Sequence, residues 1–423
     1  MSPRLWTRLD IVYDSSPGCS FESLRWLLAR SGSLPLDVRL SSSSSDRSAV
    51  EELFAPFGTT NTVQDHHVHL MKSLTRVIAV LQHSIPRWRS LTFGARTRAE
   101  AYAALLQFRQ PATLLERLNI SASHAGHTVS ALLPPPRRHQ PSLNSNSPTN
   151  HTESVMPALF GGKTPSLYSV SLRIFAEPID VPLMRNLRNI RLIDGWATID
   201  TFANLLRTNS ATLEELHIVM VDFRDAFWPL DHNLAGSGDP KDVALSRFDR
   251  VVLPSLLVLR LDVPRSTMSC LLSRLSLPSL TSLNLRRTEE AYEEWNVVDD
   301  PSAMPDAQNT PSTEDILALL KKMHEGGSLP PLQDFLLSYG SVWESNAGYR
   351  EQGTDAALIS LLRTIGGSLK NLNVQNYSHC ESTILAVRVR SPTTFSASNM
   401  STNLHPYNPN RLCLIVRICC APR

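Results

Sequence analysis

Apolar residues recur along this chain in a fixed order, first at helical spacing and then in alternation. In three segments an apolar quartet at i, i+3, i+4 and i+7 is followed by a turn and a short leucine-rich run. The quartets are Met268, Leu271, Leu272 and Leu275; Ile316, Leu319, Leu320 and Met323; and Leu358, Leu361, Leu362 and Ile365. This spacing places side chains on one side of a helix, whereas alternation places them on one face of a strand. The pattern predicts repeated helix–strand units.

The leucine-rich runs also share the way in which they begin. The phrase Pro-Ser-Leu occurs at Pro165, Pro254 and Pro278, just ahead of a run. Proline cannot donate a hydrogen bond within a sheet, so it suits the position before a strand. The leucines that start such runs include Leu167, Leu187, Leu213, Leu256 and Leu280. Several successive spacings fall in or near the leucine-rich-repeat period of about 20–29 residues.

A single helix–strand unit cannot bury both of its faces, so such units must stack on one another. We therefore predict an α/β fold, an irregular leucine-rich-repeat solenoid with one parallel strand per repeat and helices on the convex side. The irregularity is expected because regular repeats carry Asn or Cys three residues after the last strand leucine. Those places hold Ser123, Gly195, Val221, Pro264 and Thr288.

Changes in composition divide the chain into four parts. Residues 1–129 are predicted to form the N-terminal repeats of the solenoid, and residues 165–380 the main leucine-rich-repeat-like array. Between them, residues 130–164 are rich in Pro, Ser and Asn and can bury little apolar surface, which predicts a disordered insertion. Residues 381–423 break the repeat and are predicted to be an irregular C-terminal tail.

Composition and charge narrow the classes of partner. The 41 basic and 39 acidic residues nearly cancel, which predicts no general affinity for nucleic acid or an anionic membrane. No apolar run approaches the roughly 20 residues that span a bilayer. The start of the chain, Met1 to Asp10, has no apolar signal segment, and the six cysteines are sparse. We expect a reduced intracellular protein, cytoplasmic or nuclear.

The motifs that carry catalysis or bind metals are missing or incomplete. His66, His67 and His69 cluster at a predicted helix start, but no pair has the i, i+4 spacing of a helical zinc site. Gly162-Lys163-Thr164 matches the end of a phosphate-binding loop, but Pro157 replaces its first glycine. We therefore predict no catalytic residue, no cofactor and no metal. Two alternatives stay open: a hydrolase or transferase of α/β type with a degenerate motif, and a non-functional truncated fragment.

The best candidates for function are the residues between the inward-facing leucines of the strands. Because strand side chains alternate, these residues point outward, onto the concave face of the predicted solenoid. They are Arg173, Arg191, His217, Arg260, Asn284, Arg286 and Asn373. Guanidinium and amide groups suit a polar protein partner or an acidic peptide. The sequence therefore predicts a protein target bound on this face.

Three phrases near the start of the chain resemble a known family. They are Ser2-Pro3-Arg4-Leu5-Trp6-Thr7, Leu27-Leu28-Ala29-Arg30-Ser31-Gly32-Ser33-Leu34-Pro35-Leu36 and Arg87-Trp88-Arg89-Ser90-Leu91. Together with the leucine-rich runs over residues 1–375, they resemble mushroom-type F-box proteins with degenerate leucine-rich repeats. The resemblance implies the substrate-binding part of an adaptor for a cullin-RING ubiquitin ligase. The F-box that would dock such a protein onto the ligase is not found in this sequence, so ligase attachment is not predicted.

Overall fold

The computed structural model describes residues 6–13, 21–42, 60–122, 159–173, 184–193, 199–219, 250–263, 265–287, 313–338, 354–375, 401–402 and 413–417. They belong to two compact units, unit 1 within residues 1–185 and unit 2 within residues 186–423. Each unit combines helices with a mostly parallel β-sheet. The predicted α/β class and the predominance of parallel strands are confirmed.

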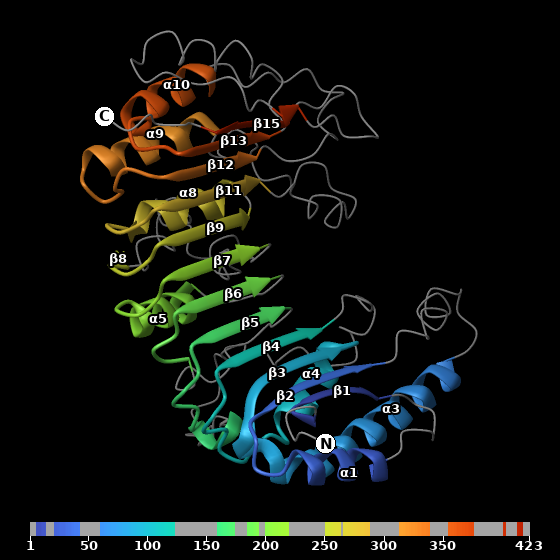
Figure 1. The fold of residues 1–423 in the computed structure, drawn as a ribbon. Coiled ribbons are helices and arrows are strands. Elements are labelled where there is room, and N and C mark those ends of the chain that lie inside the picture. The colour runs from blue at the N-terminus through green and yellow to red at the C-terminus, as the bar shows by residue number, and fades with distance from the viewer. Residues whose placement is uncertain are drawn as a thin grey trace, which may run out of the picture. The chain divides into compact units, whose positions relative to one another are not determined.

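Unit 1 contains five parallel strands that lie in chain order. They are β1 (Arg8–Tyr13), β2 (Leu36–Ser42), β3 (Trp88–Ala95), β4 (Arg117–Ala122) and β5 (Ser169–Arg173), and each pairs with the next (Figure 1). We had predicted that the residues of β5 belong to the array of residues 165–380. The hydrogen bonds of β5 instead place it beside β4 in unit 1. Sequence-adjacent parallel neighbours require a crossover between every pair, which is the connection that the repeated helix–strand pattern predicts.

The helices of unit 1 are α1 (Phe21–Ser31), α3 (Thr60–Leu81) and α4 (Arg98–Leu105). Helix α1 ends just before Gly32, which has a φ of +58°, a conformation that glycine adopts without strain. After α3 the chain passes into the 3-10 turn η3 (Gln82–Arg87), which contains Pro86. This turn delivers Trp88 to the start of β3, where the indole is fully buried.

Trp88 lies at the centre of an aromatic cluster in unit 1. Its ring meets Phe108 edge-on at 5.4 Å and Phe160 at 6.4 Å, and its Nε1 donates to Ser84 Oγ at 3.0 Å. Phe160 belongs to the 3-10 turn η5 (Leu159–Gly162), inside the segment 130–164 for which we predicted disorder. That prediction is wrong for residues 159–164, because Phe160 is buried against Phe108 and Trp88. Residues 130–158 lie outside the described part of the chain.

Unit 2 contains a longer series of parallel strands. They are β6 (Asn189–Ile193), β7 (Glu215–Val219), β9 (Val258–Val263), β11 (Ser282–Arg287), β12 (Asp334–Ser338) and β13 (Asn371–Gln375), hydrogen-bonded in that order (Figure 1). Strand β15 (Cys413–Arg417) then pairs antiparallel with β13, and β14 (Ser401–Thr402) pairs antiparallel with β15. The predicted irregular tail therefore adds strands to this sheet, while its other residues lie outside the described ranges.

The helices of unit 2 are α5 (Ile199–Asn209), α8 (Arg265–Arg274), α9 (Thr313–Glu325) and α10 (Thr354–Ile365). They lie on one side of the sheet of unit 2 (Figure 1). The predicted quartets of α8 and α10 are fully buried, whereas in α9 Leu317 is buried and Leu319 is only half-buried. A further short pair of strands, β8 (Val251–Val252) and β10 (Leu275–Ser276), lies outside this sheet.

A recurring hydrogen bond joins the turn before each strand to the same turn of the preceding repeat. In unit 2 the backbone N–H donors and carbonyl acceptors form one series with distances of 2.8–2.9 Å. The bonds run from Glu214 to Arg188, Leu257 to Glu214, Thr281 to Leu257, Gln333 to Thr281 and Lys370 to Gln333. The repeats therefore start their strands in equivalent positions, which explains the constant register along the sheet.

The Pro-Ser-Leu phrase has a structural reason beyond its proline. Ser255 Oγ donates to the carbonyl oxygen of Ala211 at 2.7 Å, and in unit 1 Ser166 Oγ donates to that of Thr113 at 3.0 Å. In each case the acceptor lies in the turn before the neighbouring strand. The serine thus satisfies a carbonyl that no strand bond reaches, and fastens one repeat to the previous one.

Asn209 at the end of α5 makes a similar connection from a buried position. Its Oδ1 accepts from the N–H of Leu187 at 2.8 Å, and its Nδ2 donates to the carbonyl oxygen of Leu205 at 2.8 Å. A turn-satisfying asparagine is thus present at the helix end. The positions after the strands where we had looked for one, such as Ser123, lie outside the described residues.

We predict that Asn209→Ala lowers the free energy of unfolding by about 1–3 kcal/mol, because it leaves the buried N–H of Leu187 without its side-chain acceptor. Urea denaturation followed by far-UV circular dichroism measures the change. Asn204→Ala is the matched control, since Asn204 is an exposed residue of the same helix. Equal effects of the two substitutions would contradict a structural role for the Asn209 amide.

Candidate partner-binding face

The sheet of unit 2 presents a row of aligned side chains on the face away from its helices, all polar except Leu336 of β12. The parallel register sets Arg191 of β6 opposite His217 of β7, and His217 opposite Arg260 of β9. Arg260 lies opposite Asn284 of β11, and the row continues through Leu336 of β12 to Asn373 of β13. We call these six residues the polar row. Five of them were predicted as binding residues, and the structure brings those five into one line across six strands.

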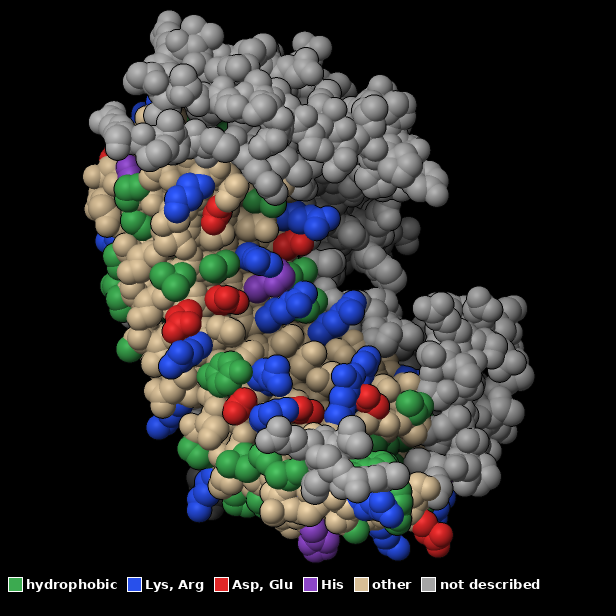
Figure 2. Space-filling model, in the orientation of Figure 1, with side chains coloured by type: hydrophobic (Ala, Val, Ile, Leu, Met, Phe, Trp, Pro, Cys, Tyr) green, Lys and Arg blue, Asp and Glu red, His purple; other side chains and the backbone are tan. Residues whose placement is uncertain are grey.

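Alternation along each strand explains why these side chains face outward. The residues on either side of Arg260, Leu259 and Leu261, are buried at 0% and 1% exposure, while Arg260 is exposed. The same holds for β7, where Leu216 and Ile218 are fully buried and His217 is half-buried between them. Figure 2 shows arginine or lysine side chains around a histidine on this face, over β6, β7, β9 and β11.

The first three members of the polar row, Arg191, His217 and Arg260, form what we call the cationic end. Partial burial, together with the charges of Arg191 and Arg260, lowers the pKa of His217 from 6.5 to about 4. The imidazole is therefore neutral at pH 7. Within the described ranges, no carboxylate forms an ion pair with Arg191 or Arg260, so both guanidinium groups retain donors for a bound molecule.

Arg286 differs from the other predicted arginines because its charge is already compensated. It lies two residues after Asn284 on β11, opposite Asp262 of β9 in the register. Its Nε is 3.8 Å from Asp262 Oδ2. The prediction that Arg286 contributes a binding group is therefore weakened. The alternation rule correctly placed it on the outward face, but only the pairing of β9 with β11 showed its acidic neighbour.

The asparagines of the row have different surroundings. Asn284 is half-buried beside Arg260, where its amide can donate and accept. Asn373 lies opposite Ile415 of β15, and its Oδ1 is shielded from solvent with no hydrogen-bond partner among the described residues. Its neighbour Asn371, on the same face of β13, donates from Nδ2 to Asp334 Oδ1 at 2.5 Å. Asn373, at the far end of the polar row, is thus more enclosed than the two arginines of the cationic end.

Arg173 is the one predicted binding residue that belongs to unit 1. It is exposed at the end of β5, and the register places it opposite Ser121 of β4. It is therefore not part of the polar row, which lies wholly in unit 2. The strand pattern correctly placed it outside the core, but it could not assign β5 to one of the two units.

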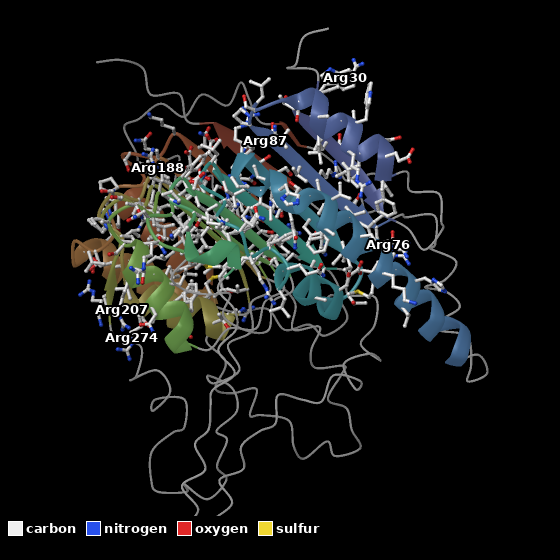
Figure 3. All side chains as sticks on the ribbon, turned by 90° about the horizontal axis from the view of Figure 1, so that it is seen from below. Arg30, Arg76, Arg87, Arg188, Arg207 and Arg274 are labelled. Carbon is white, nitrogen blue, oxygen red and sulfur yellow. The ribbon has the colours of Figure 1, made fainter. Side chains whose placement is uncertain are left out.

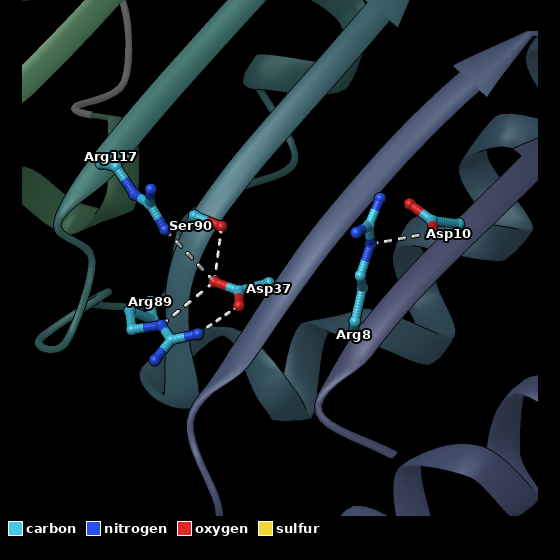
Figure 4. Close-up of polar contacts among 6 residues, drawn as sticks. All are labelled: Arg8, Asp10, Asp37, Arg89, Ser90 and Arg117. Carbon is cyan, nitrogen blue, oxygen red and sulfur yellow. Dashed lines mark hydrogen bonds and ion pairs between the residues drawn. The ribbon is translucent and has the colours of Figure 1, made fainter. Parts of the chain in front are cut away.

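The sheet face of unit 1 carries ion pairs between neighbouring side chains. Asp37 Oδ1 accepts from Arg89 Nε at 3.1 Å and from Ser90 Oγ at 2.7 Å, and lies 3.9 Å from Arg117 Nη2 (Figure 4). Partial burial tends to raise the pKa of Asp37, but these hydrogen bonds and the two arginine charges lower it overall. Beside this cluster, Arg8 Nε donates to Asp10 Oδ2 at 3.1 Å. Nothing in the local sequence pattern marked the contacts of Asp37 with Arg89, Ser90 and Arg117, because strand pairing alone brings these residues together.

Two features of the described residues concern thiol and metal chemistry. Burial raises the pKa of the Cys270 thiol to about 11, in spite of the opposing charge of Arg274, so the reactive thiolate is scarce at neutral pH. In the ranges that the structure describes, no three His, Cys, Asp or Glu residues gather as metal ligands do. No described helix is both long enough and apolar enough to cross a membrane.

No known family model matches this chain, and no curated protein matches it. Its function must therefore be inferred from the polar row and its surroundings.

Proposed function

We propose that this chain is a non-catalytic protein-recognition module that holds a partner protein on the sheet face of unit 2. The polar row carries this proposal, because it combines two uncompensated arginines, a neutral histidine and amides on one exposed sheet face. Arginine is enriched in protein interfaces, where its planar group forms several directional hydrogen bonds.

The proposal includes the architecture predicted from the repeats, an irregular leucine-rich-repeat solenoid. Support comes from the repeated backbone hydrogen bonds between successive turns of unit 2 and from the constant register of its strands. In an array of this kind each repeat contacts mainly its neighbours and adds one strand to a continuous binding surface. The resemblance of the sequence to F-box proteins with degenerate repeats fits the same role, the selection of a protein target for ubiquitin transfer.

Site-specific photocrosslinking tests this function. We expect p-benzoylphenylalanine in place of Asn284 to form adducts with a partner in an extract of the source cells. The same crosslinker in place of Asn204, exposed on α5, is the positional control. The adducts at position 284 should fall at least tenfold in the double variant Arg191→Glu/Arg260→Glu, because it reverses both charges of the cationic end.

A matched variant separates this effect from a general change of charge. Arg207→Glu/Arg363→Glu makes the same charge change on the exposed sides of α5 and α10 (Arg207 is labelled in Figure 3) and should leave the adducts unchanged. Circular dichroism confirms that each variant is folded. Adducts of equal yield at positions 284 and 204, or adducts that survive reversal of the cationic end, would contradict recognition through the polar row.

A further inference from the structure

We infer that the cationic end of the polar row binds a carboxylate-rich peptide segment of the partner. This inference rests on the proposed recognition function and adds the chemistry of what is recognised. Arg191 and Arg260 flank His217 on either side, so three nitrogen-bearing side chains face one strip of the sheet. Carboxylates form the strongest hydrogen bonds that an arginine side chain makes with a protein group, often in a two-bond arrangement.

The spacing of the two arginines suits more than one carboxylate. They lie on β6 and β9, which are separated by β7, so their backbones are about 9–10 Å apart at the usual strand spacing. In an extended peptide, alternate side chains on one side are about 6.5–7 Å apart, and a flexible arginine side chain covers the difference. Two acidic residues of one peptide segment can therefore engage both guanidinium groups across His217.

The charges around the cationic end favour a peptide over a nucleic acid. Glu215 lies on the same face of β7, two residues before His217, and Asp262 lies two residues after Arg260. Beyond Arg260 the row continues with Asn284 and the half-buried Leu336. A nucleic acid needs positive charge along its whole backbone, whereas this row has charge at one end and amide and apolar groups at the other. A peptide with a short acidic stretch matches that arrangement.

His217 links this binding to pH. The charged or titratable groups that face it are Arg191 on β6, Glu215 on its own strand, and Arg260 and Asp262 on β9, with Arg286 paired to Asp262. Partial burial of the ring, together with the charges of the two arginines, holds the pKa of His217 at about 4 in the unoccupied protein. Carboxylates placed on the arginines offset their charges and allow the imidazole to accept a proton. Binding then takes up a proton, so the affinity rises as the pH falls.

Fluorescence anisotropy with a labelled hexa-aspartate peptide and the full chain tests the inference. We expect the peptide to bind, and its affinity to fall about tenfold or more in Arg191→Gln/Arg260→Gln, since each lost charge-assisted contact weakens binding by about that factor. Arg207→Gln/Arg363→Gln, with the same loss of charge on two helices, should bind as the natural chain does. A hexa-asparagine peptide of the same length should not bind.

The pH profile supplies a second, independent readout. Carboxylates on the two arginines oppose the charges that help to lower the pKa of His217, so the affinity for hexa-aspartate should rise between pH 7.5 and pH 5.5. The rise is at most about tenfold, the limit set by a full return of that pKa from about 4 to 6.5. Aspartate stays ionised over this range, because its ordinary pKa is about 3.9. The variant His217→Gln should bind with an affinity that changes much less with pH. A rise of the same size in this variant would overturn the role of His217.

Other outcomes distinguish the two levels of the proposal. Equal binding of hexa-asparagine, undiminished binding in Arg191→Gln/Arg260→Gln, or tighter binding of a hexathymidine oligonucleotide would overturn the acidic-peptide inference. If the crosslinks at position 284 still depend on the cationic end, recognition of a protein stands and only the chemistry of its segment is wrong. If those crosslinks also fail, the recognition function itself is wrong.

Discussion

Replacing Trp88 with alanine is expected to lower the free energy of unfolding of unit 1 by about 3–5 kcal/mol, the usual cost of removing a buried tryptophan or phenylalanine. The indole is fully buried, and it joins the start of β3 to Phe108 and to Phe160 of η5. Its loss leaves a cavity where three separate segments meet. It also removes the hydrogen bond to Ser84 Oγ in η3.

Urea denaturation followed by far-UV circular dichroism measures the loss for Trp88→Ala, and hydrogen exchange locates it. Faster exchange is expected in residues 60–122. Trp26→Ala is the matched control, since Trp26 is 48% exposed and contacts mainly Trp6 and the guanidinium of Arg30 at the end of α1 (Figure 3). Such exposed ring contacts contribute about 1 kcal/mol. A loss for Trp88→Ala no greater than that of the control would show that the aromatic cluster is not part of the stable core.

The second large effect is expected at Leu261 in unit 2, where Leu261→Ala should lower the free energy of unfolding by about 2–5 kcal/mol. Leu261 is 1% exposed and lies on the helix-facing side of β9. It aligns with Ile218 of β7 and Leu285 of β11, both fully buried, so one truncation opens the apolar layer across three strands. The surrounding strands are held by their hydrogen bonds and cannot move together to fill the cavity.

The adjacent outward residue provides the control for this prediction. Arg260→Ala changes an exposed side chain and should alter the free energy of unfolding by no more than about 0.5 kcal/mol. The same variant should weaken binding to the hexa-aspartate peptide, so stability and recognition are separated on neighbouring residues of one strand. A larger loss of stability from Arg260→Ala than from Leu261→Ala would mean that Arg260, and not Leu261, lies in the core. It would contradict the outward placement of the polar row.

Local periodicity was enough to find most of the strands and their faces. Leu259 and Leu261 alternate with Arg260, and this pattern predicted both the buried layer and the outward residues of unit 2. The end of α1 before Gly32 is a local feature of the same kind, because the conformational freedom of glycine is a property of the residue itself. In α9 the buried stripe includes Leu317, which the quartet pattern left out, since packing against neighbours sets the final orientation of a helix.

Contacts between distant residues could not be read in the same way. The sequence pattern predicted disorder up to residue 164, but Phe160 is buried in the turn η5. The pattern could not show this, because the partners of Phe160, Phe108 and Trp88, lie far away in sequence. The pairing of Arg286 with Asp262 gives one of the predicted binding residues an acidic neighbour, and it depends on β11 lying beside β9. Asn209 was not predicted as a structural residue, since its hydrogen-bond partner Leu187 is 22 residues earlier in the chain.

The amino-acid sequence by itself determined the α/β class, the alternation of each strand and the identity of the outward side chains. These features depend on residues a few positions apart, whose geometry is set by the helix and strand periods. Only the tertiary structure decided that Arg191, His217 and Arg260 stand in one line, that Arg286 lies beside Asp262 and that Arg173 belongs to the other unit. Register in the polar row and in the pair of Arg286 with Asp262 joins residues that are 24 or more positions apart, and the loops and turn contacts that set it have no local period.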